Sequence, residues 1–397
     1  MPRSTTKNKK SASGAGNIRK KTVTRDGKPY TYWEARFTTG YDPLTGKQIQ
    51  RSISGKTQKE VAQKLREVTA EIDRGTYIEP CKMTVSEWMD IWLKEFLINV
   101  KPRTKDSYRS SVKTHIEPAL GMIRLDALDT LTIQRFYNRL SQTLSAKSVK
   151  NVHGVLHRAL QQAVVGKLIR DNPTVGCALP KGEKQEIHPL TEKQISDLLK
   201  VIKGQRFERI IVVTLFTGMR EGEVLGLTWD CVNLNTGSIL INKQLQRERG
   251  GNGEYHLVST KNGKGRLITA APYVVSVLRE AKAEQEQWQK ICGEAWDNSM
   301  NLVFTDEIGR HLSAQTVYLQ FKKYMEEIGA PETRFHDLRH TYAVSALRSG
   351  ADIKSVQGNL GHATASFTLD VYAHFTDDMR QDSADRMEQF ILNVKAL

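Results

Sequence analysis

The sequence predicts a multidomain α+β protein, and three observations lead to that class. The chain has 397 residues, a length that fits two or three domains. Two polar stretches that contain proline, 75–83 and 171–190, are typical of linkers and divide it into three parts. Apolar residues alternate with polar ones in the first part, follow helical spacing in the second, and do both in the third. We therefore expect a small three-stranded β-sheet with one helix, then an all-helical domain, then a mainly helical domain with a small antiparallel sheet.

The first part spans residues 18–75 and follows a tail, residues 1–17, that is rich in Lys, Ser and Gly and is expected to be disordered. The turn-like stretches "RDGK" and "DPLTGK" separate three predicted strands. These strands are expected near 19–25, 30–38 and 48–54. The amphipathic stretch "TQKEVAQKLREVTAEIDRG" predicts a helix, with Thr57 as its N-cap and Gly75 as its terminator.

Helices are predicted for most of the remaining chain. In the all-helical part, residues 84–170, they are expected at 84–100, 103–117, 130–142 and 145–168. The last part, residues 191–397, begins with a helix capped by Thr191, where "TEKQ" resembles a capping box. Further helices are expected near 206–217 and 221–227, with strands near 238–245, 254–259 and 266–269.

Charge and composition favour a nucleic-acid partner. The net charge is +15, and residues 1–80 hold 17 Lys and Arg against 8 Asp and Glu, a net of +9. A basic protein with a basic N-terminal part fits a polyanion such as DNA, although a solvated tail that aids solubility would also be basic. The sequence has no run of 18 apolar residues, so it predicts no membrane span. It also has no apolar N-terminal segment of the kind found in secretory signals. The four cysteines are scattered without a CxxC pair, which fits a reducing cytoplasm.

The stretch "RFHDLRH", residues 334–340, raises the question of an anion site. If it is helical, His336, Arg339 and His340 share one face. "HDLRH" superficially resembles the zinc motif HExxH, but a guanidinium between two metal ligands would repel the ion, and no third ligand follows. An arginine fork suits phosphate, and a neighbouring histidine can donate a hydrogen bond or move a proton. Ordinary polarity of a helix surface is the alternative.

Three further stretches carry candidate residues. Arg220 lies in a turn after an apolar helix, with Glu223 three residues on, so the carboxylate can hold the arginine or simply form an intrahelical ion pair. Residues 258–270 predict a β-hairpin that presents Lys261 and Lys264 at its tip, although a solvated hairpin tip is the commoner explanation of such a stretch seen alone. His362 follows a glycine, and Tyr372 lies ten residues later, where a tyrosine on a helix usually packs in a core.

Taken in order, these motifs resemble those of the tyrosine recombinases, the family of phage-type integrases. The family signature is Arg in TGxRxxE, Lys on a β-hairpin, HxxR, and LGH followed by Tyr. Its counterparts here are Arg220 with Glu223, Lys261, His336 with Arg339, His362 and Tyr372. The resemblance spans about 191–380. Less sharply, 84–170 is similar to the family's core-binding domain, and 18–75 to the arm-binding domain of integrases from phages and conjugative transposons.

The resemblance implies a chemistry for each residue. Tyr372 attacks the scissile phosphorus, forms a 3′-phosphotyrosine and frees a 5′-hydroxyl, so neither ATP nor any other cofactor is expected. Arg220, Arg339 and His362 bind the non-bridging oxygens. Lys261 protonates the leaving 5′-oxygen, a role that the nearby Lys264 could also fill, and His336 assists proton transfer at Tyr372. Glu223 and His340 are expected to support the site, and no catalytic metal is expected.

The implied function is a site-specific DNA recombinase that integrates and excises a mobile element in the bacterial cytoplasm. Its expected partners are double-stranded DNA with core and arm-type sites, three further copies of the chain in a tetramer on two DNA sites, and an excisionase or host DNA-bending protein. The amphipathic tail, residues 376–397, either docks on a neighbouring protomer or packs on its own domain. Two alternatives are an inactive DNA-binding regulator of the same fold and type IB topoisomerase-like strand cleavage.

Overall fold

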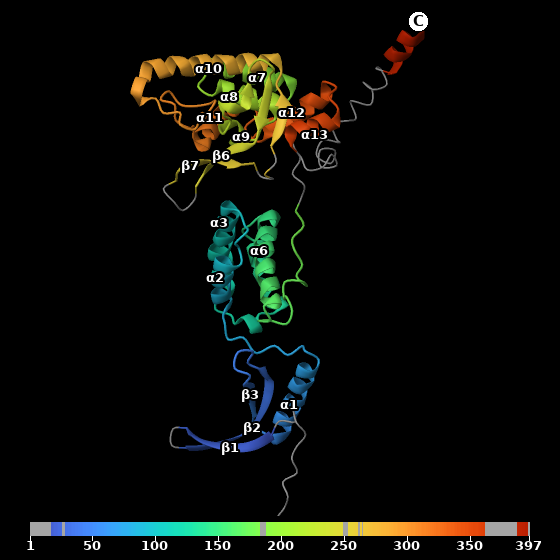
Figure 1. Ribbon diagram of the computed structural model, residues 1–397. Helices are drawn as coiled ribbons and strands as arrows, with labels where there is room; N and C mark the ends of the chain where they lie inside the picture. Colours follow the sequence, from blue (N-terminus) through green and yellow to red (C-terminus); the bar gives the residue numbers. More distant parts are fainter. Residues whose placement is uncertain are drawn as a thin grey trace, which may run out of the picture. The chain divides into compact units, whose positions relative to one another are not determined.

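The computed structural model describes residues 17–25, 28–182, 188–248, 253–260, 263, 265–361 and 387–395. The chain divides into two compact units, Met1–Glu183 and Lys184–Leu397, which are described separately (Figure 1). Apart from Asn17, the expected disordered tail lies outside the described residues.

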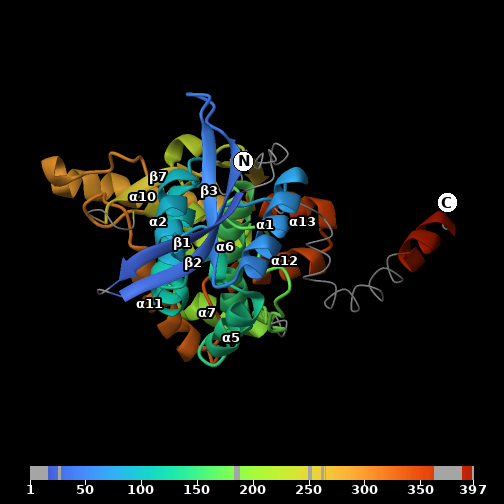
Figure 2. The same ribbon diagram turned by 90° about the horizontal axis from the view of Figure 1, so that it is seen from below.

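The first unit begins with a three-stranded antiparallel sheet in the order β1-β2-β3, as the sequence predicts. The strands are β1 (Asn17–Arg25), β2 (Lys28–Tyr41) and β3 (Gln48–Gly55). Helix α1 (Gln58–Asp73) begins at the predicted N-cap, where the side chain of Thr57 accepts a hydrogen bond from the backbone of Glu60. It lies against the sheet (Figures 1 and 2), and a small core forms between them from Ala35, Phe37, Val61 and Leu65.

The rest of the first unit is helical, and the four predicted helices are confirmed. They are α2 (Val85–Glu95), α3 (Pro102–Ser111), α5 (Thr130–Leu140) and α6 (Ala146–Val165). Side chains of Thr84, Asp129 and Ser145 cap α2, α5 and α6. After α3 the chain continues through a π turn (Val112–Ile116) into α4 (Glu117–Leu120), whose second residue, Pro118, has no N–H to continue the helical ladder. Trp88 anchors the core by donating to the carbonyl of Ala159 at 2.9 Å.

The second unit is built around one helix that is apolar on all sides. Helix α8 (Glu208–Thr217) reads "ERIIVVTLFT", and Ile210 to Leu215 are all buried, as expected for a helix in the middle of a core. Around it lie α7 (Glu192–Val201), α9 (Glu221–Leu225), α10 (Pro272–Cys292), α11 (Ala314–Glu327), α12 (Asp337–Arg348) and α13 (Ile353–Leu360). The predicted capping box at Thr191 is confirmed.

The strands of the second unit pair differently from the sequence-based prediction. One sheet has the order β4-β5-β8 and the other the order β6-β7. Their strands are β4 (Val232–Asn233), β5 (Ser238–Ile241), β6 (Lys243–Arg247), β7 (Tyr255–Ser259) and β8 (Arg266–Thr269). The single strand predicted at 238–245 is split into two at Asn242.

The predicted hairpin over residues 258–270 is therefore wrong. Its two strands, β7 and β8, do not pair with each other, because β7 pairs with β6 and β8 pairs with β5. The carbonyl of Asn242 accepts the N–H of Thr260 at 3.3 Å, just after β7 ends, and β8 begins at Arg266. Between these two strands in the sequence, Gly263 has a φ of 67°, a conformation that favours glycine. Two strands that pair with each other and two that pair with different neighbours have the same local pattern, so periodicity alone could not separate these cases.

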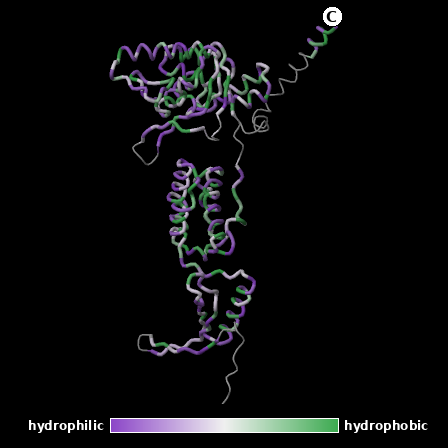
Figure 3. The backbone as a smooth tube through the Cα atoms, viewed as in Figure 1, coloured by the Kyte–Doolittle hydropathy of each residue, from purple (hydrophilic) through white to green (hydrophobic). Residues whose placement is uncertain are grey.

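None of the described helices combines the length and the apolar composition that a membrane span needs. Along the long helices α6 and α10, polar residues interrupt the apolar ones (Figure 3). In the tail, residues 387–395 are helical and expose Met387, Phe390, Leu392 and Val394, while residues 376–386 lie outside the described part.

Candidate active site

The stretch "RFHDLRH" forms the start of α12 rather than its middle. His336 is the N-cap, and the helix begins at Asp337. The Asp337 carboxylate accepts hydrogen bonds from the backbone N–H of Arg334 at 2.8 Å and from its guanidinium at 2.8 and 3.0 Å. An acidic residue is stabilised at a helix N-terminus, and the buried side chains of Phe335 and Leu338 fix the direction of the turn. The local sequence thereby sets where Arg339 points.

Arg339 is buried and joins two segments that are far apart in the sequence. Only 2% of its surface is exposed. Its Nη1 donates to the carbonyl oxygen of Gly218 at 2.7 Å, and its Nη2 donates to that of Leu360. Gly218 ends α8, and Leu360 ends α13, so one guanidinium connects the turn before Arg220 with the chain just before His362. Carbonyl oxygens hold a guanidinium by their dipoles without cancelling its charge.

Close packing at Gly218 supports this junction. Gly218 has a φ of 66°, and a Cβ there would lie 2.5 Å from the Tyr342 ring of α12 and 2.8 Å from Leu360 of α13. The hydroxyl of Tyr342 accepts a hydrogen bond from the Asn359 amide at 2.8 Å. Only glycine lets α8, α12 and α13 approach this closely.

Arg220 occupies the turn between α8 and α9, as the N-cap of α9. Its backbone N–H and its Nη1 both donate to Glu223, at 2.9 and 2.7 Å. The Arg220 side chain is 33% exposed, whereas that of Glu223 is 1% exposed. The buried carboxylate of Glu223 thus fixes the Arg220 side chain, part of which stays open to solvent.

Arg266 also binds Glu223, and the sequence analysis missed it. Its Nη1 and Nη2 donate to the two carboxylate oxygens of Glu223 at 3.0 and 2.6 Å, and its Nε donates to the carbonyl of Asn359 at 2.7 Å. One signal was present in the sequence. In the strand "RLIT", alternation places Arg266 on the same face as the buried Ile268, and a charged residue on an inward face needs a partner.

The cluster carries net positive charge. Burial alone would raise the pKa of Glu223, but hydrogen bonds from Arg266, together with the charges of Arg266 and Arg220, hold it at about 2. One carboxylate therefore faces two arginines, and the charges of Arg220 and Arg339 both act on His336. An arrangement of this kind suits a phosphate group.

His336 and His340 lie next to each other at the start of α12, with ring centroids 5.3 Å apart. His336 is open to solvent on one side, yet the surrounding protein desolvates it and lowers its pKa, as do the charges of Arg339 and Arg220. Desolvation and the neighbouring His336 lower the pKa of His340 to about 4. Both rings are therefore neutral near pH 7 and can accept a proton.

Four of the sequence-predicted site residues, Lys261, Lys264, His362 and Tyr372, lie outside the described residues. The structure brings together Arg220, Glu223, His336, Arg339 and His340. It also describes Gly361, which ends α13 with a φ of 64° and immediately precedes His362. Among the residues that can be described, no group of three or more His, Cys, Asp or Glu side chains comes together as metal ligands would.

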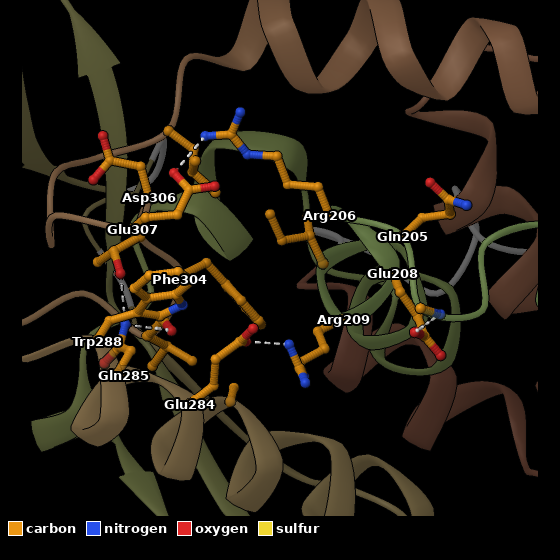
Figure 4. A pocket seen from close by; sticks show the side chains of 16 residues that line it. Gln205, Arg206, Glu208, Arg209, Glu284, Gln285, Trp288, Phe304, Asp306 and Glu307 are labelled. Carbon is orange, nitrogen blue, oxygen red and sulfur yellow. Dashed lines mark hydrogen bonds and ion pairs between the residues drawn. The ribbon is translucent and has the colours of Figure 1, made fainter. Parts of the chain in front are cut away.

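A separate pocket of about 400 Å³ lies among the 204–210 segment, α10 and residues 303–307 (Figure 4). Its arginines are matched by carboxylates, because Arg206 pairs with Glu307 at 3.2 Å and Arg209 pairs with Glu284. It shares no lining residue with the arginine cluster. Because its positive charges are already neutralised, this pocket is a weaker candidate for an anion than the cluster.

Comparison with known proteins agrees with these motifs. The model of the phage integrase family matches residues 188–379, and that of the phage integrase N-terminal SAM-like domain matches residues 84–141. A tyrosine recombinase XerC-like protein of Caldanaerobacter subterraneus subsp. tengcongensis is 26% identical over 380 residues, which cover 91% of this chain and 97% of that protein.

Two solved structures share the fold, which confirms the predicted fold class. One is a fragment of the Tn1549 transposon integrase in complex with transposon right end DNA, with a TM-score of 0.66 and 23% identity over 77% of this chain and 100% of that one. The other is a lambda integrase tetramer bound to a Holliday junction, with a TM-score of 0.53 and 19% identity over 85% of this chain and 92% of that one. The matched family models, the relative and the shared fold lead to one conclusion: the chain belongs to the phage integrase family of tyrosine recombinases, enzymes of site-specific DNA recombination.

Proposed function

We propose that this chain integrates and excises a mobile element by cleaving DNA through a 3′-phosphotyrosine at Tyr372. The observation that carries the proposal is the buried junction of Arg339, which joins the turn of Arg220 to the end of α13, ahead of His362 and Tyr372. Three motifs that are far apart in the sequence thereby serve one phosphate.

The first step is a transesterification. The Tyr372 hydroxyl oxygen attacks the scissile phosphorus, the bond to the 5′-oxygen breaks, and the ester is conserved in the protein–DNA link, so rejoining requires no ATP. Negative charge gathers on the non-bridging oxygens in the transition state. Arg220, Arg339 and His362 donate to these oxygens, and a preorganised donor of this kind contributes roughly 3–4 kcal/mol.

Proton transfer accompanies both ends of the step. His336 takes the proton of Tyr372, because its lowered pKa keeps the ring neutral near pH 7. Lys261, which lies between β7 and β8 in the sequence, gives a proton to the leaving 5′-oxygen, and Lys264 is the other candidate. His340 packs beside His336 and supports the ring's orientation.

The other parts of the chain bind DNA around the cleaved site. Residues 84–170 contact the core site, a role that exposed basic side chains on α3 and α6 support, among them Arg103, Arg109, Lys147, Lys150 and Arg158. Residues 18–75 contact arm-type sites. Four protomers assemble on two DNA sites in the bacterial cytoplasm, the tail at 376–397 docks on a neighbouring protomer, and an excisionase or host DNA-bending protein selects the direction.

A covalent-trapping experiment tests the nucleophile. Full-length protein is incubated with a nicked attachment-site duplex, so that the cleaved strand diffuses away and the adduct accumulates. Tyr372→Phe should form no adduct, while its affinity for the duplex stays within about threefold, because only a hydroxyl is lost. The control is Tyr273→Phe, an exposed tyrosine of α10, which should form the adduct normally. A full adduct yield from Tyr372→Phe would show that another residue is the nucleophile.

A second experiment separates the two lysines. Lys261→Ala should slow cleavage by about 10²–10⁴-fold, the usual contribution of a general acid, and Lys264→Ala should slow it much less. A 5′-bridging phosphorothiolate needs little protonation as it leaves, so this substrate should restore the rate of Lys261→Ala. Restoration of Lys264→Ala instead would transfer the role of general acid to Lys264.

A further inference from the structure

Arg266 has no role in the proposed chemistry, yet it makes the most extensive contacts with Glu223. It covers both carboxylate oxygens, whereas the side chain of Arg220 contacts one of them. The Arg266 side chain is 12% exposed, compared with 33% for Arg220. Arg266 is therefore the deeper of the two cations that compensate this buried anion.

Burial makes the compensation necessary. A carboxylate that is 1% exposed is costly to keep charged unless a cation and hydrogen bonds replace its water. With Arg266 in place, the fork-shaped contact neutralises Glu223, and the charge of Arg220 remains available. Without Arg266, the buried carboxylate would have Arg220 as its remaining arginine partner, and that pair would be neutral.

The same guanidinium contacts the end of α13. Its Nε donates to the carbonyl of Asn359, and a Cβ on Gly361 would lie 3.0 Å from the Cδ of Arg266. The side chain thus lies against the last turn of α13, directly before His362. One residue of β8 therefore contacts both segments that carry proposed phosphate ligands.

We propose that Arg266 is a positioning residue for DNA cleavage, which neutralises Glu223 so that Arg220 can bind the scissile phosphate and which holds the end of α13 ahead of His362. This inference rests on the proposed role of Arg220 as a phosphate ligand. Arg266 itself does not touch the phosphate.

The test is a double-mutant cycle on the full chain, measured as single-turnover cleavage of the nicked duplex. Arg266→Met should slow cleavage by about 100-fold, the loss expected when a catalytic group is displaced by about 1 Å, while DNA affinity changes by less than about threefold. Arg266→Lys keeps the charge but loses the fork, so its rate should lie between those of Arg266→Met and the unmodified protein.

A second substitution that restores part of the cleavage rate separates a positioning role of Arg266 from a merely structural one. In the Arg266→Met background, Glu223→Gln should raise the cleavage rate by about tenfold, because an amide keeps the bond to the Arg220 backbone but no longer captures its charge. Glu223→Gln alone should be slower than the unmodified protein, since Arg266 then lacks its anion. A double variant that is as slow as Arg266→Met, or slower, would overturn the proposal.

Controls separate this inference from the proposed function. Arg209→Met removes an arginine of another ion pair in the same unit and should leave cleavage within about twofold. If Arg220→Ala cleaves normally, the proposed phosphate site is wrong. If Arg220→Ala is inactive and Arg266→Met is fully active, only the role of Arg266 is wrong. Should Arg266→Met fail to fold, Arg266→Lys with and without Glu223→Gln gives the same comparison, and a lysine variant as fast as the unmodified protein would contradict the need for a fork.

Discussion

Glu34 in the N-terminal sheet and Glu223 in α9 each bind two cations, but the two clusters differ in their access to water. Glu34 accepts two hydrogen bonds from Arg19, at 2.8 and 3.2 Å, and lies 3.6 Å from Lys21. Both carboxylates are buried, but Arg19 is 49% exposed, so water screens its charge. Arg266 is 12% exposed, and Glu223 is enclosed beneath it and Arg220.

The difference shows how burial turns common ion-pair chemistry into a candidate active site. On the sheet, hydrogen bonds from Arg19 lower the pKa of Glu34, and the cations remain free to move in water. In the second unit, the carboxylate and the backbone carbonyls that bind Arg339 fix the guanidinium groups in place. Preorganised donors of that kind can stabilise a transition state, because they need not reorganise as charge develops.

The strongest way to break this comparison is to replace arginine by lysine in both regions. Arg339→Lys should slow single-turnover cleavage by about 10²–10³-fold, because an ammonium cannot bind the carbonyls of Gly218 and Leu360 and also present a fork to the phosphate. Arg19→Lys should leave cleavage within about twofold, since Arg19 is half exposed and water screens its charge. Equal losses of cleavage rate in Arg339→Lys and Arg19→Lys would contradict the distinction between the buried and the exposed arginine.

Removing each carboxylate should separate the two regions by stability. Glu223→Gln leaves buried arginines without their anion, and the free energy of opening in the second unit should fall by roughly 3–5 kcal/mol. For Glu34→Gln, the loss in the N-terminal sheet should be roughly 0.5–1 kcal/mol. Hydrogen exchange resolved to peptides reports both regions in the full chain. If the free energy of opening fell more at the N-terminal sheet than around α9, the Glu34 cluster would be the more strongly coupled of the two, which would contradict the comparison.

The pH dependence of stability sharpens the comparison through His340. Its folded pKa of about 4 lies below the ordinary value of 6.5, so between these values the unfolded chain binds more protons. The contribution of His340 to the free energy of unfolding is therefore fully present above pH 6.5. It is lost as the pH falls towards 4, and the loss is roughly 3 kcal/mol at most. Thermal unfolding of His340→Gln should show a weaker decline over this range.

A matched histidine controls for the loss of an imidazole. His256 lies on β7, where its side chain is more than one-third exposed, and His256→Gln should keep the decline seen in the unmodified protein. If His340→Gln and the unmodified protein decline in parallel, the His340 ring is not protected from protonation.

The sequence predicted most of the helices, because caps and apolar spacing are local signals. Thr57, Thr84 and Thr191 each begin a helix within one residue of the predicted position. The partners of β7 and β8 could not be predicted, because the pattern of each strand does not show that β7 pairs with β6 and β8 pairs with the more distant β5. Local pattern does not encode which of two strands becomes the neighbour.

The candidate site shows the same division. Motif order identified Arg220, Glu223, His336 and Arg339, and the contact between Arg220 and Glu223 follows from their spacing of three residues. Arg266 was missed because its partners, Glu223 and Asn359, lie 43 and 93 positions away along the chain. Only the fold brings such residues together, and a charge on an inward strand face was the one local sign of it.

One measurement tests most directly whether the buried guanidinium groups serve the charge of the scissile phosphate. The phosphate of the nicked duplex is replaced by a methylphosphonate, which carries no negative charge, and cleavage by Arg339→Ala is compared with that by the unmodified protein. On phosphate, Arg339→Ala should lose about 10³-fold in rate, whereas on methylphosphonate the two proteins should differ by less than about tenfold. An equal loss on both substrates would contradict the account, because Arg339 would then act on the fold and not on the charge.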